Sequence, residues 1–275
     1  MDSGLEAVLR RHRAVSIAAL VLLTLLAWVW LLAGAGMGMD PLVSLSPFPA
    51  GEASMPGMAM DRGMGAVMEP AMAWSATRFA LTFSMWWIMM VAMMLPSAAP
   101  TILLYARAAV QGQAQVRPAT ESFLAGYLAA WGAFSLAATV LQLLLERAGL
   151  LAPMLMASES RWLSAAILIL AGLYQLSPLK DVCLRHCRNP AQFLSRHYRP
   201  GWTGALRMGV LHGTWCVGCC WLLMALLFVG GVMNLAWIAL LTLMVAAEKI
   251  LPYGRAISLV AGLGCIVWGV GMLLG

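Results

Sequence analysis

The residues best suited to chemistry lie together in one short segment, residues 212–220, which reads HGTWCVGCC. An α-helix advances ~100° per residue, so His212, Cys216 and Cys219 would fall within ~60° of one another, with Cys220 at the margin of that face. Imidazole and thiolate groups are ligands that suit Cu(I) or Zn²⁺. We therefore predict a metal or redox site here, and the plain alternative is that these side chains only pack in the core.

A second group of ligand types precedes this segment. Cys183 and Cys187 are spaced i, i+4 with His186 beside them, and the basic neighbours Lys180 and Arg185 favour the thiolate form. The spacing is not that of a zinc finger, and one pair of cysteines cannot close a structural zinc site alone. We expect ligands from residues 212–220 to complete it.

Methionine is unusually frequent, with 21 residues in the chain. Eight of them fall within residues 37–72, in a predicted loop that has no core for a flexible thioether to fill. The alternative is a low-complexity loop in which the methionines are incidental. Met85, Met89 and Met93 follow at i, i+4 and i+8, which places them within ~80° on one helix face. Thioether sulfur suits Cu(I), so we predict a ladder of ligands there, with ordinary packing as the competing interpretation.

The composition shows what must position these residues. With 62% hydrophobic residues, 10% charged residues and a mean hydropathy of +0.85, the chain is predicted to be an integral membrane protein rather than a soluble globule, a disordered chain or a disulfide scaffold. The net charge of +6 is spread over short segments between apolar runs. That distribution orients a chain in a lipid bilayer and does not indicate a nucleic-acid partner.

Apolar runs of membrane-spanning length predict an all-α, polytopic transmembrane helical bundle of about seven spans. Pro96 and Pro100 should kink or end the second span. We divide the chain into an N-terminal anchor helix (1–36), an external Met-rich loop (37–78) and a six-helix membrane domain (79–275) with an internal basic loop (178–204). The predicted spans are 14–36, 79–104, 120–145, 162–177, 205–229, 234–251 and 256–274.

The charge distribution also predicts the orientation. With the N-terminus inside and the C-terminus outside, only four of the 17 Lys and Arg residues fall outside, as the positive-inside rule requires. Within the predicted spans, Glu248 stands beside Lys249, and adjacent helical residues do not face each other. We expect Glu248 to meet Arg207 or Arg255 near the inner face.

Several of these motifs together resemble a bacterial family of predicted metal-binding integral membrane proteins of unknown function. The resemblance covers roughly residues 79–255 and implies metal binding in a multi-pass protein of the bacterial inner (cytoplasmic) membrane. It specifies neither the metal nor an activity. The residues that carry it are Met85-Trp86-Trp87, Met93-Met94-Leu95-Pro96, Pro178-Leu179-Lys180 with Cys183 and Cys187, 212–221, and Gly231-Val232-Met233-Asn234 with Glu248-Lys249.

The leading hypothesis is a membrane copper-handling protein. External methionines would collect Cu(I), the Met ladder and the His/Cys face would hold it in the bilayer, and Cys183 and Cys187 would exchange it inside. Transport and delivery to a partner cuproenzyme or metallochaperone both fit, zinc is the alternative metal, and an oligomer is left open.

Two other classes of function compete with it. Cys216 and Cys219 form a Cys-x-x-Cys pair, as in a thiol/disulfide or quinone-linked oxidoreductase, although a regular helix holds i and i+3 thiols poorly for a disulfide. A structural subunit of a larger complex is the third class. The residues leave open whether the chain is an enzyme and favour a role without catalysis.

Overall fold

A computed structural model describes residues 2–36, 74–111, 116–152 and 156–274. In those residues the regular structure is helical, apart from one isolated bridge between Leu151 and Ser158. The prediction of an all-α protein is therefore confirmed. Most of the predicted Met-rich loop, residues 37–73, lies outside the described part of the chain.

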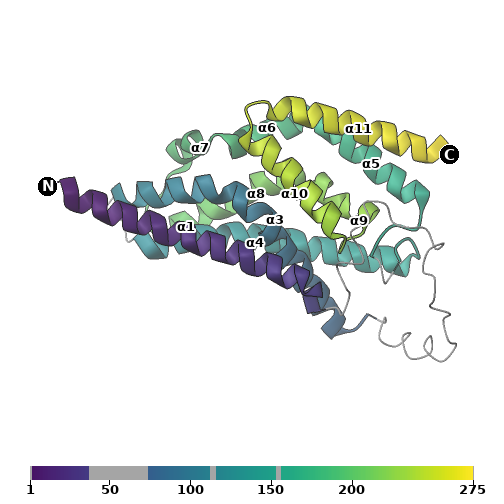
Figure 1. The fold of residues 1–275 in the computed structure, drawn as a ribbon, viewed down its shortest axis with the longest axis horizontal. Helices are drawn as coiled ribbons and strands as arrows, with labels where there is room; N and C mark the ends of the chain where they lie inside the picture. Colours follow the sequence, from purple (N-terminus) through teal and green to yellow (C-terminus); the bar gives the residue numbers. More distant parts are fainter. Residues whose placement is uncertain (1, 37–73, 112–115, 153–155, 275) are drawn as a thin grey trace.

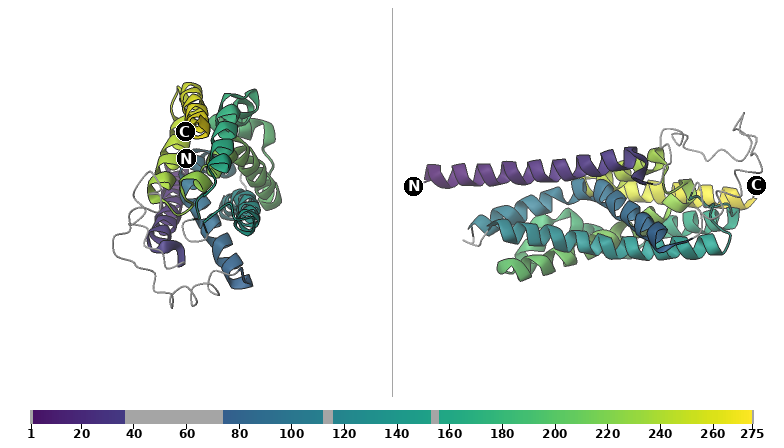
Figure 2. Two further views of the ribbon diagram at one scale, coloured as in Figure 1. Left: turned by 90° about the vertical axis from the view of Figure 1, so that its right-hand side faces the viewer. Right: turned by 90° about the horizontal axis from the view of Figure 1, so that it is seen from below.

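Each predicted span contains a helix, and the helices lie roughly along one long axis, with the two termini at its opposite ends (Figure 1). The second view shows α1 along one side of the bundle (Figure 2). The elements are α1 (Asp2–Leu32), η1 (Gly34–Gly36), α3 (Ala76–Gln111), α4 (Val116–Arg147), α5 (Arg161–Leu176), α6 (Pro178–Arg188), α7 (Pro190–His197), α8 (Gly201–Ala225), α9 (Leu227–Gly230), α10 (Leu235–Ile250) and α11 (Gly254–Leu274).

Five stretches of the described chain are long and apolar enough to cross a membrane, which is fewer than the predicted seven. A sixth arises if α5 and α6, bent by 66° at their junction, count as one broken span. The predicted spans on α5 and α10 are helices of only 16 residues each, which is short for a bilayer core of ~30 Å. The orientation of the termini stays a prediction. The five stretches are Ala14–Leu32, Ala76–Ala109, Ala119–Arg147, Gly201–Gly230 and Gly254–Leu274.

The second predicted span is a single helix, α3, that continues through Pro96 and Pro100. Proline removes a backbone donor and disturbs the preceding turn, which bends a helix when neighbouring helices hold both halves. Figure 1 shows α3 changing direction along its length instead of ending.

Helices α4 and α8 make a close crossing that rests on glycines. A Cβ atom on Gly209 would lie 2.0 Å from the carbonyl oxygen of Phe123, and one on Gly126 would lie 2.2 Å from that of Leu206. Small residues let helix backbones approach closely in a membrane, where apolar burial alone gives little preference for a partner helix. This crossing places the cysteine-bearing part of α8 in the interior.

The predicted basic loop 178–204 contains two helices, α6 and α7. Ser177 begins α6 by accepting a hydrogen bond from the backbone N–H of Lys180, with a proline at the first turn. The chain bends by 66° between α5 and α6, and α6 packs on α8. The sequence of α6 has no apolar pattern that predicts this packing, because the helix is rich in charged residues and few of its side chains are buried.

Glu248 has a different partner from the two that we expected. Its carboxylate accepts a hydrogen bond from the Lys180 ammonium at 2.6 Å, with both side chains buried, and another from the Gln175 amide at 2.9 Å. Lys180 also donates to Gln175. Arg255 instead pairs with Asp181 at 2.9 Å. The prediction of Arg207 or Arg255 was wrong, because Lys180 from the predicted basic loop is buried against Glu248.

Candidate metal centre

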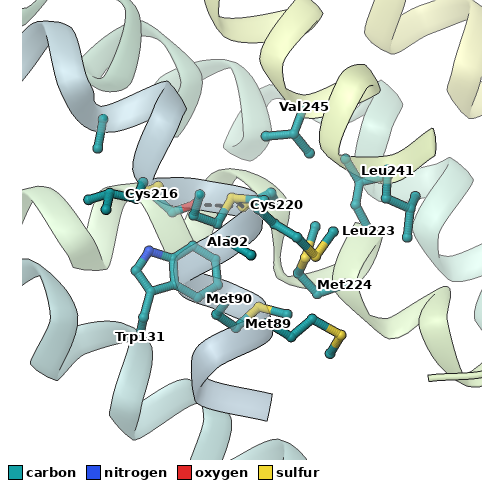
Figure 3. Packing of buried hydrophobic residues seen from close by; sticks show 14 of the residues in the cluster. Met89, Met90, Ala92, Trp131, Cys216, Cys220, Leu223, Met224, Leu241 and Val245 are labelled. Carbon is teal, nitrogen blue, oxygen red and sulfur yellow. Dashed lines mark hydrogen bonds between the residues drawn. The ribbon is translucent and has the colours of Figure 1, made fainter. Parts of the chain in front are cut away.

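Two helices bring cysteines together inside the bundle. Cys216, Cys219 and Cys220 of α8 are each at most 2% exposed, and Cys187 of α6 approaches them, with its sulfur 4.0 Å from that of Cys219. The close-up view shows Cys216 and Cys220 among packed apolar side chains (Figure 3). We call Cys187, Cys216, Cys219 and Cys220 the sulfur cluster.

Cys183 lies one turn before Cys187 and faces Gly218 of α8. A Cβ atom on Gly218 would be 3.1 Å from the Cys183 sulfur, so the glycine leaves room for that thiol. The Tyr174 hydroxyl donates to the Gly218 carbonyl at 2.5 Å, which fixes α5 against the same turn. Cys265 of α11 is half-buried.

A buried lysine completes the surroundings of Cys216. The Lys249 ammonium of α10 lies 3.0 Å from the Cys216 sulfur and 3.3 Å from the Ser97 hydroxyl. The Tyr127 hydroxyl is 3.3 Å from the same sulfur and 3.1 Å from the Met94 carbonyl oxygen, to which it donates. A neighbouring positive charge favours a thiolate, which is the form that binds metals.

The methionines of α3 are all buried. Met94, which is not one of the three residues of the predicted ladder, has its sulfur 3.8 Å from that of Cys220. Met85, Met89 and Met93 are at most 1% exposed, and Figure 3 shows Met89 and Met90 packed beside Trp131 and Met224. The structure thus joins the methionine helix to the sulfur cluster through Met94.

The two candidate histidines lie in different surroundings. His212 is 2% exposed, its ring packs against those of Phe123, Tyr127 and Phe193, and its Nδ1 atom has no hydrogen-bond partner among the described residues. It stands one turn before Cys216 on α8. His186 stacks on Trp215 with ring centroids 4.2 Å apart, and its Nδ1 atom is 2.8 Å from the Val182 carbonyl oxygen.

The sulfur atoms are arranged in pairs rather than as a closed cage. Within the described residues, no group of three or more His, Cys, Asp or Glu side chains is arranged to hold a metal ion. Metal–sulfur bonds of ~2.3 Å allow two ligands of one ion to lie up to ~4.6 Å apart. The Cys187–Cys219 separation of 4.0 Å and the Cys220–Met94 separation of 3.8 Å are both within this limit.

This donor set consists of thiols and a thioether, with no carboxylate among them. Soft sulfur ligands favour Cu(I) over the harder divalent ions that carboxylates and water bind. A surface cavity of about 320 Å³ lies away from the sulfur cluster, lined by residues 196–199 with Arg207, Met208 and Leu211. The cysteines of the sulfur cluster, on α6 and α8, are also contacted by Met94 of α3, Tyr127 of α4 and Lys249 of α10.

Comparison with known proteins agrees with this chemistry. Residues 83–272 match the family model described as PpoB2, copper chaperone. This region includes α4 to α10 and most of α3 and α11, and with them every residue of the sulfur cluster. No curated protein and no solved structure matches the chain. Because the family match extends over more than half of the sequence, the chain belongs to the PpoB2 copper chaperone family.

Proposed function

We propose that this protein binds Cu(I) in the membrane at the sulfur cluster and delivers it to a partner cuproenzyme. The observation that carries the proposal is the approach of Cys187 on α6 to Cys219 on α8, with sulfur atoms 4.0 Å apart. Membership of a copper chaperone family supports the handling of copper. Metal identity, oxidation state and delivery are our inferences from the ligands.

The number of ligands supports Cu(I) over zinc. A structural zinc site is almost always closed by four ligands, whereas Cu(I) is stable with two or three sulfur donors. Cys187 and Cys219 provide two thiols, and Cys216 lies on the same part of α8. Incomplete coordination helps a protein that has to release its metal ion. An incoming thiolate can then bind the ion before a protein ligand leaves.

The burial of the sulfur atoms suggests a direction for that exchange. Met94 and Cys220 are fully buried, while Cys187 and Cys183 on α6 are half-buried. Copper would move from the interior pair to the α6 thiols by ligand exchange, in which one copper–sulfur bond forms as another breaks and the copper stays monovalent. The Met-rich segment and the Met ladder remain proposed collecting sites before this step.

The test is the copper content of paired variants. Full-length protein is purified in detergent without chelator under reducing conditions, and elemental analysis is combined with X-ray absorption to count sulfur neighbours. The double variant Cys187→Ser/Cys219→Ser is expected to lose its copper, while Cys265→Ser, away from the cluster, keeps it. Undiminished copper in the double variant would refute the site, and a nitrogen- or oxygen-rich shell would refute the ligand assignment.

A thiol/disulfide oxidoreductase is the second candidate, but with a different pair of cysteines from the one we first considered. Cys216 and Cys219 share α8, and the Cys219 thiol donates to the Cys216 carbonyl. Cys187 and Cys219 come from different helices and are close enough to form a bond after a small shift. A redox-dependent gel shift in metal-free protein that disappears in Cys187→Ser would favour this function over copper delivery.

A further inference from the structure

The sulfur cluster contains a buried positive charge. Lys249 is 8% exposed, and its ammonium contacts the Cys216 sulfur and the Ser97 hydroxyl. Among the ion pairs of the described residues, none joins Lys249 to a carboxylate, since the adjacent Glu248 is bound to Lys180. An unbalanced charge is costly in a protein interior within a membrane, so thiolates are the natural counter-ions of this ammonium.

The charge of Lys249 determines which bound metal leaves the cluster neutral. Cu(I) held by two thiolates carries a single negative charge, which the ammonium cancels. A divalent ion held by the same two thiolates is already neutral, so that the ammonium leaves one positive charge uncompensated. For a site with two thiolates, the lysine favours a monovalent ion and opposes a divalent one.

We infer that Lys249 is the built-in counter-ion of a bis-thiolate Cu(I) complex and makes the cluster select monovalent over divalent metals. The inference rests on the proposed function, because it assumes that copper binds at these cysteines. It assigns Lys249 a positioning and selectivity role and not that of a ligand. The contact at 3.0 Å places the charge close enough to act on any ion bound by Cys216 or its neighbours.

A purely structural lysine would behave differently. If Lys249 only held α10 against Ser97 of α3, a neutral replacement would loosen the cluster and lower its affinity for all metal ions equally. A counter-ion instead changes the binding affinity of each metal ion according to the charge of that ion. Two unit charges ~4 Å apart at an effective dielectric constant of ~20 interact strongly enough to change affinity by about 10³-fold, which screening and rearrangement reduce.

The experiment measures Cu(I) and Zn²⁺ affinities of the full chain in detergent by anaerobic competition with a chromophoric chelator. In Lys249→Met and Lys249→Gln, we expect the ratio of Cu(I) to Zn²⁺ affinity to fall by at least about tenfold. Lys249→Arg keeps the charge and should keep the ratio, and Ser97→Ala controls for the lost hydrogen bond. Thermal unfolding of each variant shows whether it is folded. If Lys249→Met does not fold, Lys249→Gln provides the neutral variant.

The outcomes separate the two claims. A wild-type protein that binds no Cu(I) refutes the proposed function. A wild type that binds Cu(I) at the cysteines, with the same metal ratio in the neutral variants, refutes only the role of Lys249. A ratio that falls equally in Lys249→Arg also overturns the inference, because the guanidinium retains the positive charge.

Discussion

Replacing Glu248 with glutamine should strongly destabilise the protein. The Lys180 ammonium lies 2.6 Å from the Glu248 carboxylate, and the two side chains are 0% and 2% exposed. The glutamine amide cannot balance that charge, so the buried ammonium loses its counter-ion. Breaking a buried ion pair in this way costs about 3–5 kcal/mol, which we expect as the loss in free energy of unfolding for Glu248→Gln.

The assay is reversible denaturant unfolding of purified protein in one detergent, compared with two matched variants. The double variant Lys180→Met/Glu248→Leu removes both charges and should recover most of the loss, because apolar side chains of similar size replace the pair. Asp181→Asn breaks the more exposed pair with Arg255, at 23% and 39% exposure, and should cost at most about 1 kcal/mol.

The result that refutes this reasoning is a Glu248→Gln variant as stable as the wild type, or a double variant no better than the single one. Either would mean that the pair is not desolvated as the structure places it. A second consequence concerns the sulfur cluster. Because Lys180 and Cys187 share α6, Glu248→Gln should also increase the rate at which a maleimide reagent alkylates Cys187 and should reduce bound copper.

Two further predictions concern the packing and the polar contacts around the sulfur cluster. Gly209→Ala should reduce the free energy of unfolding, followed by thermal unfolding, by about 1–3 kcal/mol, because the added Cβ atom would overlap a backbone oxygen of α4. Gly264→Ala is the control and should be neutral, because no atom lies within 4 Å of its added Cβ atom. Equal effects of the two substitutions would contradict the close crossing. Tyr127→Phe removes the hydroxyl that contacts Cys216 and donates to the Met94 carbonyl. Its Cu(I) affinity, measured by chelator competition, should fall about fivefold, which corresponds to about 1 kcal/mol. An unchanged affinity would show that this hydroxyl does not support the site.

Much of the fold could be predicted because long apolar runs have few alternatives in a bilayer. Each predicted span contains a helix, which is the form expected of an apolar run long enough to cross a membrane, because a helix satisfies its own backbone hydrogen bonds. Cys216, Cys219 and Cys220 lie on one such helix, and all three are buried. What spacing cannot determine is which neighbouring helix covers that face.

The partners of the sulfur cluster were missed for that reason. The contacts of Lys249 with Cys216 and of Met94 with Cys220 join residues far apart in the sequence, and only helix packing makes them neighbours. A lysine inside a predicted span was the available signal, since an ionisable residue in a membrane helix requires a partner. The packing of α6 on α8 left no apolar pattern in the sequence, because the buried Lys180 resembles a solvated residue.

Two adjacent residues of α10 connect the parts of the candidate site. Glu248 faces Lys180 on the helix that carries Cys187, and Lys249 faces Cys216 on the helix that carries Cys219. Side chains one residue apart on a helix diverge by ~100°, so a single turn of α10 can bind α6 and α8 at the same time. A rotation of α10 by one residue would remove the salt bridge that holds α6 and the charge that accompanies the thiols. The separation of Cys187 from Cys219 and the charge at the sulfur cluster are therefore coupled through the register of one helix.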